Sequence, residues 1–155
     1  PELSRNQDDE LNFRLKRAGG KIWQSPSIRS TYTPRNSLKA VFRQYLQYGF
    51  WKVAVIRKHK AVASWRHTVP VLFVLSIPAC LLGRMWTVLG LESAVYGLAL
   101  LAASLPYAGE LPLGSLLLLP LVIATHHVAY GLGFLCGLLR FGQTTSPRYF
   151  TALTR

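Results

Sequence analysis

The chain has 155 residues, of which 50% are hydrophobic, and its formal net charge at pH 7 is +12. So large an apolar fraction excludes an ordinary soluble domain of this size. The charge is also unevenly spread, because residues 1–66 hold fourteen basic and four acidic residues, whereas residues 67–155 hold four and two. A basic polar half therefore precedes a nearly uncharged apolar half.

The first predicted element is a helix that opens with three of the chain's six acids, Asp8, Asp9 and Glu10. Acids in a first turn suit the positive end of the helix dipole, and Asn6 or Asp8 can serve as the cap. Basic residues follow in the last turn, and Gly19–Gly20 supplies a left-handed stop. On local evidence the cluster is an ordinary helix start, because acidic first turns are common and catalytic ones are rare.

Two short β-type runs follow this helix, at Ile22–Trp23 and Ile28–Tyr32, and Ser25–Pro26 separates them. A helix that ends in glycine and leads into short strands is typical of the end of an α/β domain. We therefore expect residues 1–35 to form the C-terminal end of such a domain.

A long basic amphipathic helix is predicted over residues 36–66, with Ser37 as its cap. Apolar and aromatic residues recur at three-and-four spacing from Leu38 to Ile56, and most basic residues lie off that stripe. Such a helix, just before an apolar region, fits one that lies in the membrane interface and contacts anionic lipids. Nucleic acid is an unsuitable partner, because apolar spans follow within a dozen residues.

Residues 67–140 form the predicted transmembrane region, with two to three helices. A spanning helix needs about 20 mainly apolar residues. Of three apolar stretches, the third, Leu111–Leu139, meets this easily. The first, Thr68–Gly83, meets it if the helix continues past Arg84 toward Leu91. The second is short and contains Pro106, so it crosses tilted or only dips in. The three stretches are Thr68–Gly83, Ser93–Gly109 and Leu111–Leu139.

Positive charge predicts the orientation of the chain in a bacterial inner (plasma) membrane. The fourteen basic residues ahead of the first span favour the cytoplasmic side for the polar half. Arg140 and the basic residues of the tail, residues 141–155, favour the same side, whereas three crossings would place them on the opposite side. The two expectations conflict unless one apolar stretch fails to cross.

Polar and small residues inside the apolar stretches are predicted to be structural. His126 and His127 point about 100° apart on a helix, so they are expected to bond across helices rather than share a ligand. Arg84 and Glu92 are expected to be interface anchors, and Cys80 and Cys136 to be small buried hydrophobes without a disulfide. Gly131, Gly133 and Gly137 with Ala129 predict a face for close helix packing.

Two stretches of the polar half, "RNQDDELNFRLKRAGGKIW" and "RQYLQYGFWKV", stand in order before the apolar spans. Together they resemble the C-terminal part of membrane-bound family 2 glycosyltransferases, most like the succinoglycan or exopolysaccharide biosynthesis type. The resemblance covers residues 1–66 by motif and the spans by pattern. It implies a mainly α chain: the helix and short strands that end an α/β glycosyltransferase domain, then the interface helix, then two to three transmembrane helices.

The resemblance also implies roles for the residues that match the family's motifs. In that family the Asp of an acidic motif is the general base, which implies this role for Asp8 and orienting roles for Gln7 and Asp9. Gln7 departs from the family's usual Glu. A second motif, Q-x-x-R-W, helps hold the acceptor and the donor diphosphate. Gln47 and Trp51 match it, Phe50 replaces its Arg, and Arg43 or Lys52 is expected to supply the charge.

The function implied is inverting transfer of a sugar from a nucleotide-sugar donor to a lipid-linked or polysaccharide acceptor. The family binds its donor and a divalent metal (Mg or Mn) through an N-terminal domain with an Asp-x-Asp motif. No such motif precedes Asp8, so we expect no metal ligand in this segment and a fragment that is inactive alone. The rival interpretation is a non-enzymatic module, a basic membrane anchor or scaffold.

Overall fold

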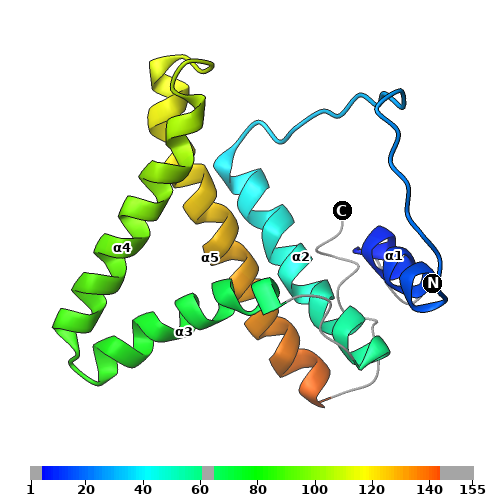
Figure 1. Ribbon diagram of the computed structural model, residues 1–155. Coiled ribbons are helices and arrows are strands. Elements are labelled where there is room, and N and C mark those ends of the chain that lie inside the picture. The colour runs from blue at the N-terminus through cyan, green and yellow to red at the C-terminus, as the bar shows by residue number, and fades with distance from the viewer. Residues whose placement is uncertain (1–4, 61–64, 144–155) are drawn as a thin grey trace.

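A computed structural model describes residues 5–60 and 65–143, and within these ranges the chain is mainly helical, with no strand. This confirms the mainly α prediction. Figure 1 shows a long helix pair at the centre, with one short helix to one side and two apolar helices to the other. The elements are α1 (Gln7–Arg17), α2 (Leu38–His59), η1 (Trp65–His67), α3 (Val69–Leu82), α4 (Trp86–Ser104), η2 (Leu105–Tyr107) and α5 (Leu113–Gln143).

The prediction of short strands after α1 is wrong for the described residues. Residues 18–37 form an irregular connection that runs from the end of α1 to the start of α2 (Figure 1). Trp23 is 90% exposed and Ile28 76% exposed, so neither run packs on the rest of the structure. A β-type run becomes a strand only beside a neighbour that takes its hydrogen bonds, and no described segment pairs with these residues.

The pair formed by α2 and α5 is the centre of the fold, and the two helices run in the same direction (Figure 1). Their backbones approach closely at glycines. A Cβ on Gly49 of α2 would lie 2.1 Å from the carbonyl oxygen of Tyr130, and one on Gly133 of α5 would lie 2.0 Å from that of Leu46. The absence of a side chain at these positions is therefore what allows the helices to pack.

The predicted small-residue face of α5 is confirmed, and it serves two neighbours. Gly137 lies against Phe50 and Val53 of α2, as Gly133 lies against Leu46, whereas Gly131 lies against Pro70 of α3. Ala129 is fully buried. Gly131 therefore serves α3 and the other two glycines serve α2, so helices close in from two directions along one stretch of α5.

The second half of α2 is buried on nearly all sides, whereas the predicted amphipathic helix would have one solvent-exposed face. Phe50, Trp51, Val53 and Val55 are each no more than 5% exposed, and Phe141 of α5 packs on them. On its other side this half of α2 contacts α1 through polar groups described below. The apolar stripe predicted from the sequence is therefore real, and polar side chains of α1 reach the opposite face. Ser37 is the predicted cap, and its hydroxyl accepts a hydrogen bond from the Ala40 amide at 3.3 Å.

Three segments are long and apolar enough to cross a membrane, by length and composition: Trp65–Leu82, Trp86–Tyr107 and Leu113–Phe141. Most of their large side chains are exposed, as expected for surfaces that face lipid. The expectation that the first helix continues toward Leu91 is wrong. The chain turns at Arg84, whose φ is +54°, and α4 begins at Trp86.

Two further expectations about the apolar half are corrected. Glu92 is not an end anchor, because it lies inside α4 and accepts a hydrogen bond of 2.6 Å from the Ser76 hydroxyl of α3. Cys80 is buried as predicted, whereas Cys136 is exposed on α5; both are free thiols. Residues 144–155, which include most of the predicted tail, lie outside the described residues.

Candidate functional site

Helix α1 presents the acidic motif; its N-terminal end is held by a contact with α2, and its C-terminal end is fixed by the local sequence. Asn6 is the N-cap residue with a left-handed backbone, φ 59°, but its side chain does not cap the helix. Its Nδ2 instead donates a hydrogen bond of 3.1 Å to the Tyr48 carbonyl of α2. At the other end Gly19 has φ +80°, and the Gly20 amide donates to the Leu15 carbonyl at 2.9 Å, as in a Schellman stop. The predicted glycine stop is confirmed.

The three consecutive acids of α1 have three different environments. Asp8 is exposed, and no described residue forms a hydrogen bond or an ion pair with its carboxylate. Asp9 is half-buried and pairs with the ammonium group of Lys52 on α2, which is itself buried. Glu10 is only 5% exposed. Successive helical residues project about 100° apart. For this reason Asp8 faces solvent, Asp9 faces the contact with α2, and Glu10 faces the interior.

Glu10 ties α1 to the end of α2. Its carboxylate lies 3.1 Å from Lys58 Nζ, His59 Nε2 and Arg14 Nε. Burial acts to raise the pKa of Glu10, but the hydrogen bonds from Lys58 and His59 and the charges of Arg14 and Lys58 outweigh it, so the pKa is lowered. The ring of Phe13 adds an apolar contact, with its centroid 4.6 Å from that of His59.

The residues predicted to hold the acceptor or the diphosphate lie on α2 and are mostly enclosed. Gln47 is 6% exposed and Trp51 2% exposed. Phe50, at the position of the family's Arg, packs against Phe141 with ring centroids 5.0 Å apart. This position faces the α5 core, which explains why an apolar side chain stands there. The indole Nε1 of Trp51 is buried and has no hydrogen-bond partner among the described residues.

The structure brings together some of the predicted site residues and separates others. Lys52 and Asp9 are in direct contact, so the two motif stretches meet. Arg43 is exposed and lies nine residues before Lys52 on α2, about 13.5 Å along the helix axis. Gln7 is exposed in the first turn of α1. Arg43 and Lys52 therefore occupy different levels of the molecule.

A groove of about 500 Å³ lies along the face of α1 that begins at Asp9. Its walls combine a carboxylate, an amide, two cations and two apolar side chains, a mixture suited to a polar ligand with an apolar face. Apart from Asp9, sequence reasoning missed these residues, although the spacing of Asn12 and Lys16 from Asp9 on one helical face could have indicated them. The lining residues are Asp9, Asn12, Phe13, Lys16, Arg17 and Ile22.

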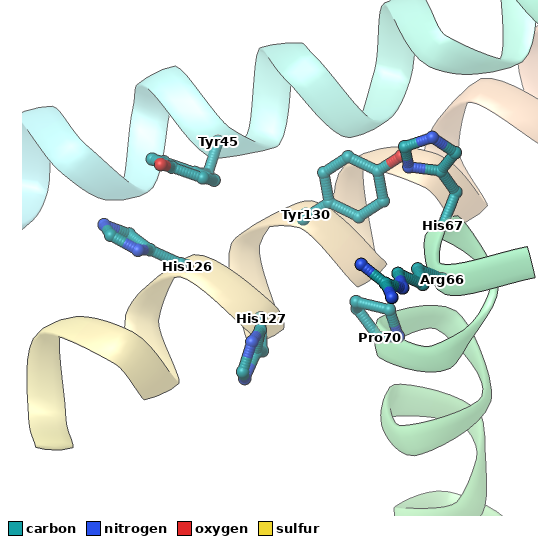
Figure 2. Close-up of a pocket in the computed structure, with 7 residues that line it drawn as sticks. All are labelled: Tyr45, Arg66, His67, Pro70, His126, His127 and Tyr130. Carbon is teal, nitrogen blue, oxygen red and sulfur yellow. The ribbon is translucent and has the colours of Figure 1, made fainter. Parts of the chain in front are cut away.

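A second cavity, of about 270 Å³, lies between α2, η1, α3 and α5 and is shown in Figure 2. His126 stacks on Tyr45 of α2, with ring centroids 3.9 Å apart and planes 13° apart. His127 Nδ1 lies 3.0 Å from the Tyr96 hydroxyl of α4. The prediction that the two histidines contact different helices is thus confirmed. Burial, followed by the neighbouring Tyr48 and Tyr32, raises the pKa of Tyr45, so its phenol remains a donor.

Within residues 5–60 and 65–143 no group of three or more His, Cys, Asp and Glu side chains could hold a metal ion. The described part of the chain presents an exposed carboxylate at a helix start, Asp8. Beside it lie a groove with cationic and hydrogen-bonding side chains, and an aromatic cavity rich in nitrogen donors.

Comparison with known proteins gives two relatives. The chain is 30% identical over 143 residues to the succinoglycan biosynthesis protein ExoA of Rhizobium meliloti (strain 1021), covering 90% of this chain and 42% of that protein. It is 29% identical over 139 residues to the dolichyl N-acetyl-alpha-D-glucosaminyl phosphate 3-beta-D-2,3-diacetamido-2,3-dideoxy-beta-D-glucuronosyltransferase of Methanococcus voltae, covering 89% of this chain and 40% of that protein.

The chain thus spans about two fifths of the length of the curated relatives it matches. No family model and no solved structure matches it. The similarity to both relatives extends over about nine tenths of this chain. It confirms the resemblance to glycosyltransferases that the acidic motif and the aromatic helix indicated.

Proposed function

We propose that the chain is the C-terminal part of a membrane glycosyltransferase that moves a sugar from a nucleotide-sugar donor to a lipid-linked or polysaccharide acceptor. The observation that carries this proposal is the state of Asp8. Of the three acids in the motif, Asp9 and Glu10 are engaged in joining α1 to α2, and Asp8 alone presents an exposed carboxylate without a described partner.

In the proposed reaction Asp8 acts as the general base. Its carboxylate takes the proton of the acceptor hydroxyl while that oxygen forms a bond to the anomeric carbon of the donor sugar. The bond from that carbon to the nucleotide diphosphate breaks, and the configuration inverts. The helix dipole favours the ionised form of a carboxylate in the first turn, and the pair of Asp9 with Lys52 fixes the direction of that turn.

The remaining parts of the reaction belong to the proposal as well. A divalent metal and the donor nucleotide would be held by a donor-binding domain, and the polar half would face the cytoplasm at the inner membrane. The groove that begins at Asp9 would accommodate part of the acceptor saccharide, because it joins an aromatic ring to hydrogen-bonding groups one residue away from Asp8.

The test is Asp8→Asn in the full-length protein, assayed for transfer of a radiolabelled sugar. We expect transfer to fall by about 10² to 10⁴, because a positioned base contributes on that scale, while protein level and donor binding persist. Glu110→Gln, which removes an exposed carboxylate from the connection between η2 and α5, is the matched control and keeps its activity. Near-normal turnover of Asp8→Asn would instead favour a non-enzymatic membrane anchor.

A further inference from the structure

The cavity between α2, η1, α3 and α5 is distinct from the acidic motif. Its nitrogen-bearing side chains are one guanidinium and three imidazole groups. Arg66 and His67 come from η1, His126 and His127 from α5, and Figure 2 shows all four around one space. Among the residues that the structure describes, no Asp or Glu lines the cavity. A guanidinium is always charged and presents several donors in a fork that matches phosphate oxygens, so this lining suits an anion.

Three aromatic contacts hold the donors of the cavity in place. The stack with Tyr45 fixes His126, and the hydrogen-bond contact with Tyr96 fixes His127. The ring of Tyr130 lies beside that of His67, with centroids 6.3 Å apart and planes 29° apart. A site whose donors are fixed in advance loses little entropy when it binds a ligand.

The hydroxyl of Tyr130 gives a second, independent indication of a ligand. It is buried and has no hydrogen-bond partner among the described residues, although Tyr130 lines the cavity. A buried O–H group is costly when unpaired, and a small turn of the ring toward the cavity would bring this hydroxyl to an acceptor oxygen bound there. Phosphate oxygens are strong acceptors of such bonds.

The position of the cavity along the chain indicates where such an anion would come from. Arg66 and His67 stand at the start of the first apolar segment, directly after Trp65, which is 72% exposed. Trp and Arg at the end of an apolar segment mark the level of lipid headgroups. Leu72, one turn into α3, is 63% exposed on the lipid-facing surface. An anion at this level, next to hydrocarbon, is the phosphate of a lipid.

We propose that this cavity binds the phosphate or diphosphate group of a membrane lipid. The further statement that this lipid carries the acceptor saccharide rests on the proposed function. Lys52 and Asp9 lie near enough to His67 to influence it electrostatically, so the cavity adjoins the joint between the two motif stretches. A lipid held there by its phosphate would present its head toward α1.

The experiment measures lipid retention by the full-length protein in nanodiscs of phosphatidylcholine, with and without phosphatidic acid, by native mass spectrometry. Arg66→Gln and Tyr130→Phe are compared with Arg57→Gln, which removes an exposed cation from α2 outside the cavity. Each cavity variant should weaken retention of phosphatidic acid about tenfold, because each removes a bond to a charged group. Arg57→Gln should retain it as the parent does.

Other results would overturn the proposal. Equal weakening in Arg57→Gln would mean general attraction of positive charge to acidic lipid. Inorganic phosphate and a nucleoside diphosphate are added as separate probes. If one of them is retained through the cavity residues and phosphatidic acid is not, the ligand is a soluble anion. Tyr130→Phe removes an unpaired hydroxyl and keeps the ring, so unchanged retention in this well-folded variant also contradicts the proposal. Asp8→Asn should retain the lipid, which separates this outcome from failure of the proposed transfer.

Discussion

Three adjacent carboxylates in α1 show how one residue step changes the role of a side chain. Asp8 faces solvent, Asp9 faces Lys52 and Glu10 faces the end of α2. The sequence placed all three at a helix start, and this was correct. It could not separate their roles, because Lys52 and Lys58 are more than forty residues away and only the fold places them beside α1. The general-base role of Asp8 stays a prediction.

Glu10 makes the attachment of α1 sensitive to acid. Its pKa lies below the ordinary value of 4.5, because its contacts with Lys58, His59 and Arg14 outweigh its burial. A lowered pKa stabilises the folded form above the unfolded value, and this stability is lost as the pH falls through the folded value. We therefore expect the amides of α1 to lose protection from hydrogen exchange below pH 4.5, whereas those of α5 remain protected.

Glu10→Gln is the control for this behaviour. The neutral amide has no charge to lose, so α1 in this variant should exchange faster at pH 7 and change little on acidification. A parent protein whose α1 amides stay equally protected at pH 7 and well below pH 4.5 would show that Glu10 does not hold the helix.

The helices differ in how well local sequence defines them. The Ser37 cap and the Gly19–Gly20 stop act through bonds within a few residues, and both were predictable. The turn at Arg84 was not, because a single charge between two apolar stretches is also compatible with a continuous helix, and a left-handed Arg has no distinct sequence pattern. The strand prediction failed for the opposite reason, since β-type residues need a partner that local sequence does not contain.

The α2–α5 pair should be intolerant of even one methyl group at its closest approach. A Cβ on Gly133 would lie 2.0 Å from the Leu46 carbonyl oxygen, and backbone cannot move aside as a flexible side chain does. Gly133→Ala should therefore lower the free energy of unfolding by about 1–3 kcal/mol, as overpacking does. Thermal unfolding in detergent measures this effect. Gly97→Ala in α4, where nothing lies within 4 Å, should unfold at or above the parent temperature.

At the scale of the whole molecule, the contacts of α1 constrain how the chain crosses the membrane. Charged α1 lies against the second half of α2, and that half packs on Phe141 near the end of α5. We therefore expect the end of α2 and the end of α5 to lie on one side of the membrane, which requires an even number of crossings. We expect α3 to be the segment that does not cross, because its 14 residues extend only about 21 Å, although the whole segment Trp65–Leu82 is long and apolar enough. Figure 1 shows α3 running from α5 outward to the start of α4, at a steep angle to the pair.

We expect two crossings, by α4 and α5, which also resolves the conflict between the basic polar half and Arg140. A membrane-impermeant maleimide should label Gly109→Cys from outside intact cells and leave Ser27→Cys unlabelled, with both native cysteines replaced by Ser. A C-terminal tag should be protected from external protease. A tag that is digested from outside would show that all three segments cross.

The joint between Asp9 and Lys52 has a consequence for the product. It fixes the distance between Asp8 and the cavity at Arg66, because α1 is joined to α2 and α2 forms part of the cavity wall. If a lipid phosphate binds in that cavity, the distance from the cavity to Asp8 selects acceptor saccharides by their length. On the proposed function, only a saccharide long enough to reach Asp8 would present its terminal hydroxyl for extension, so the scaffold itself would set the stage at which the growing chain is elongated.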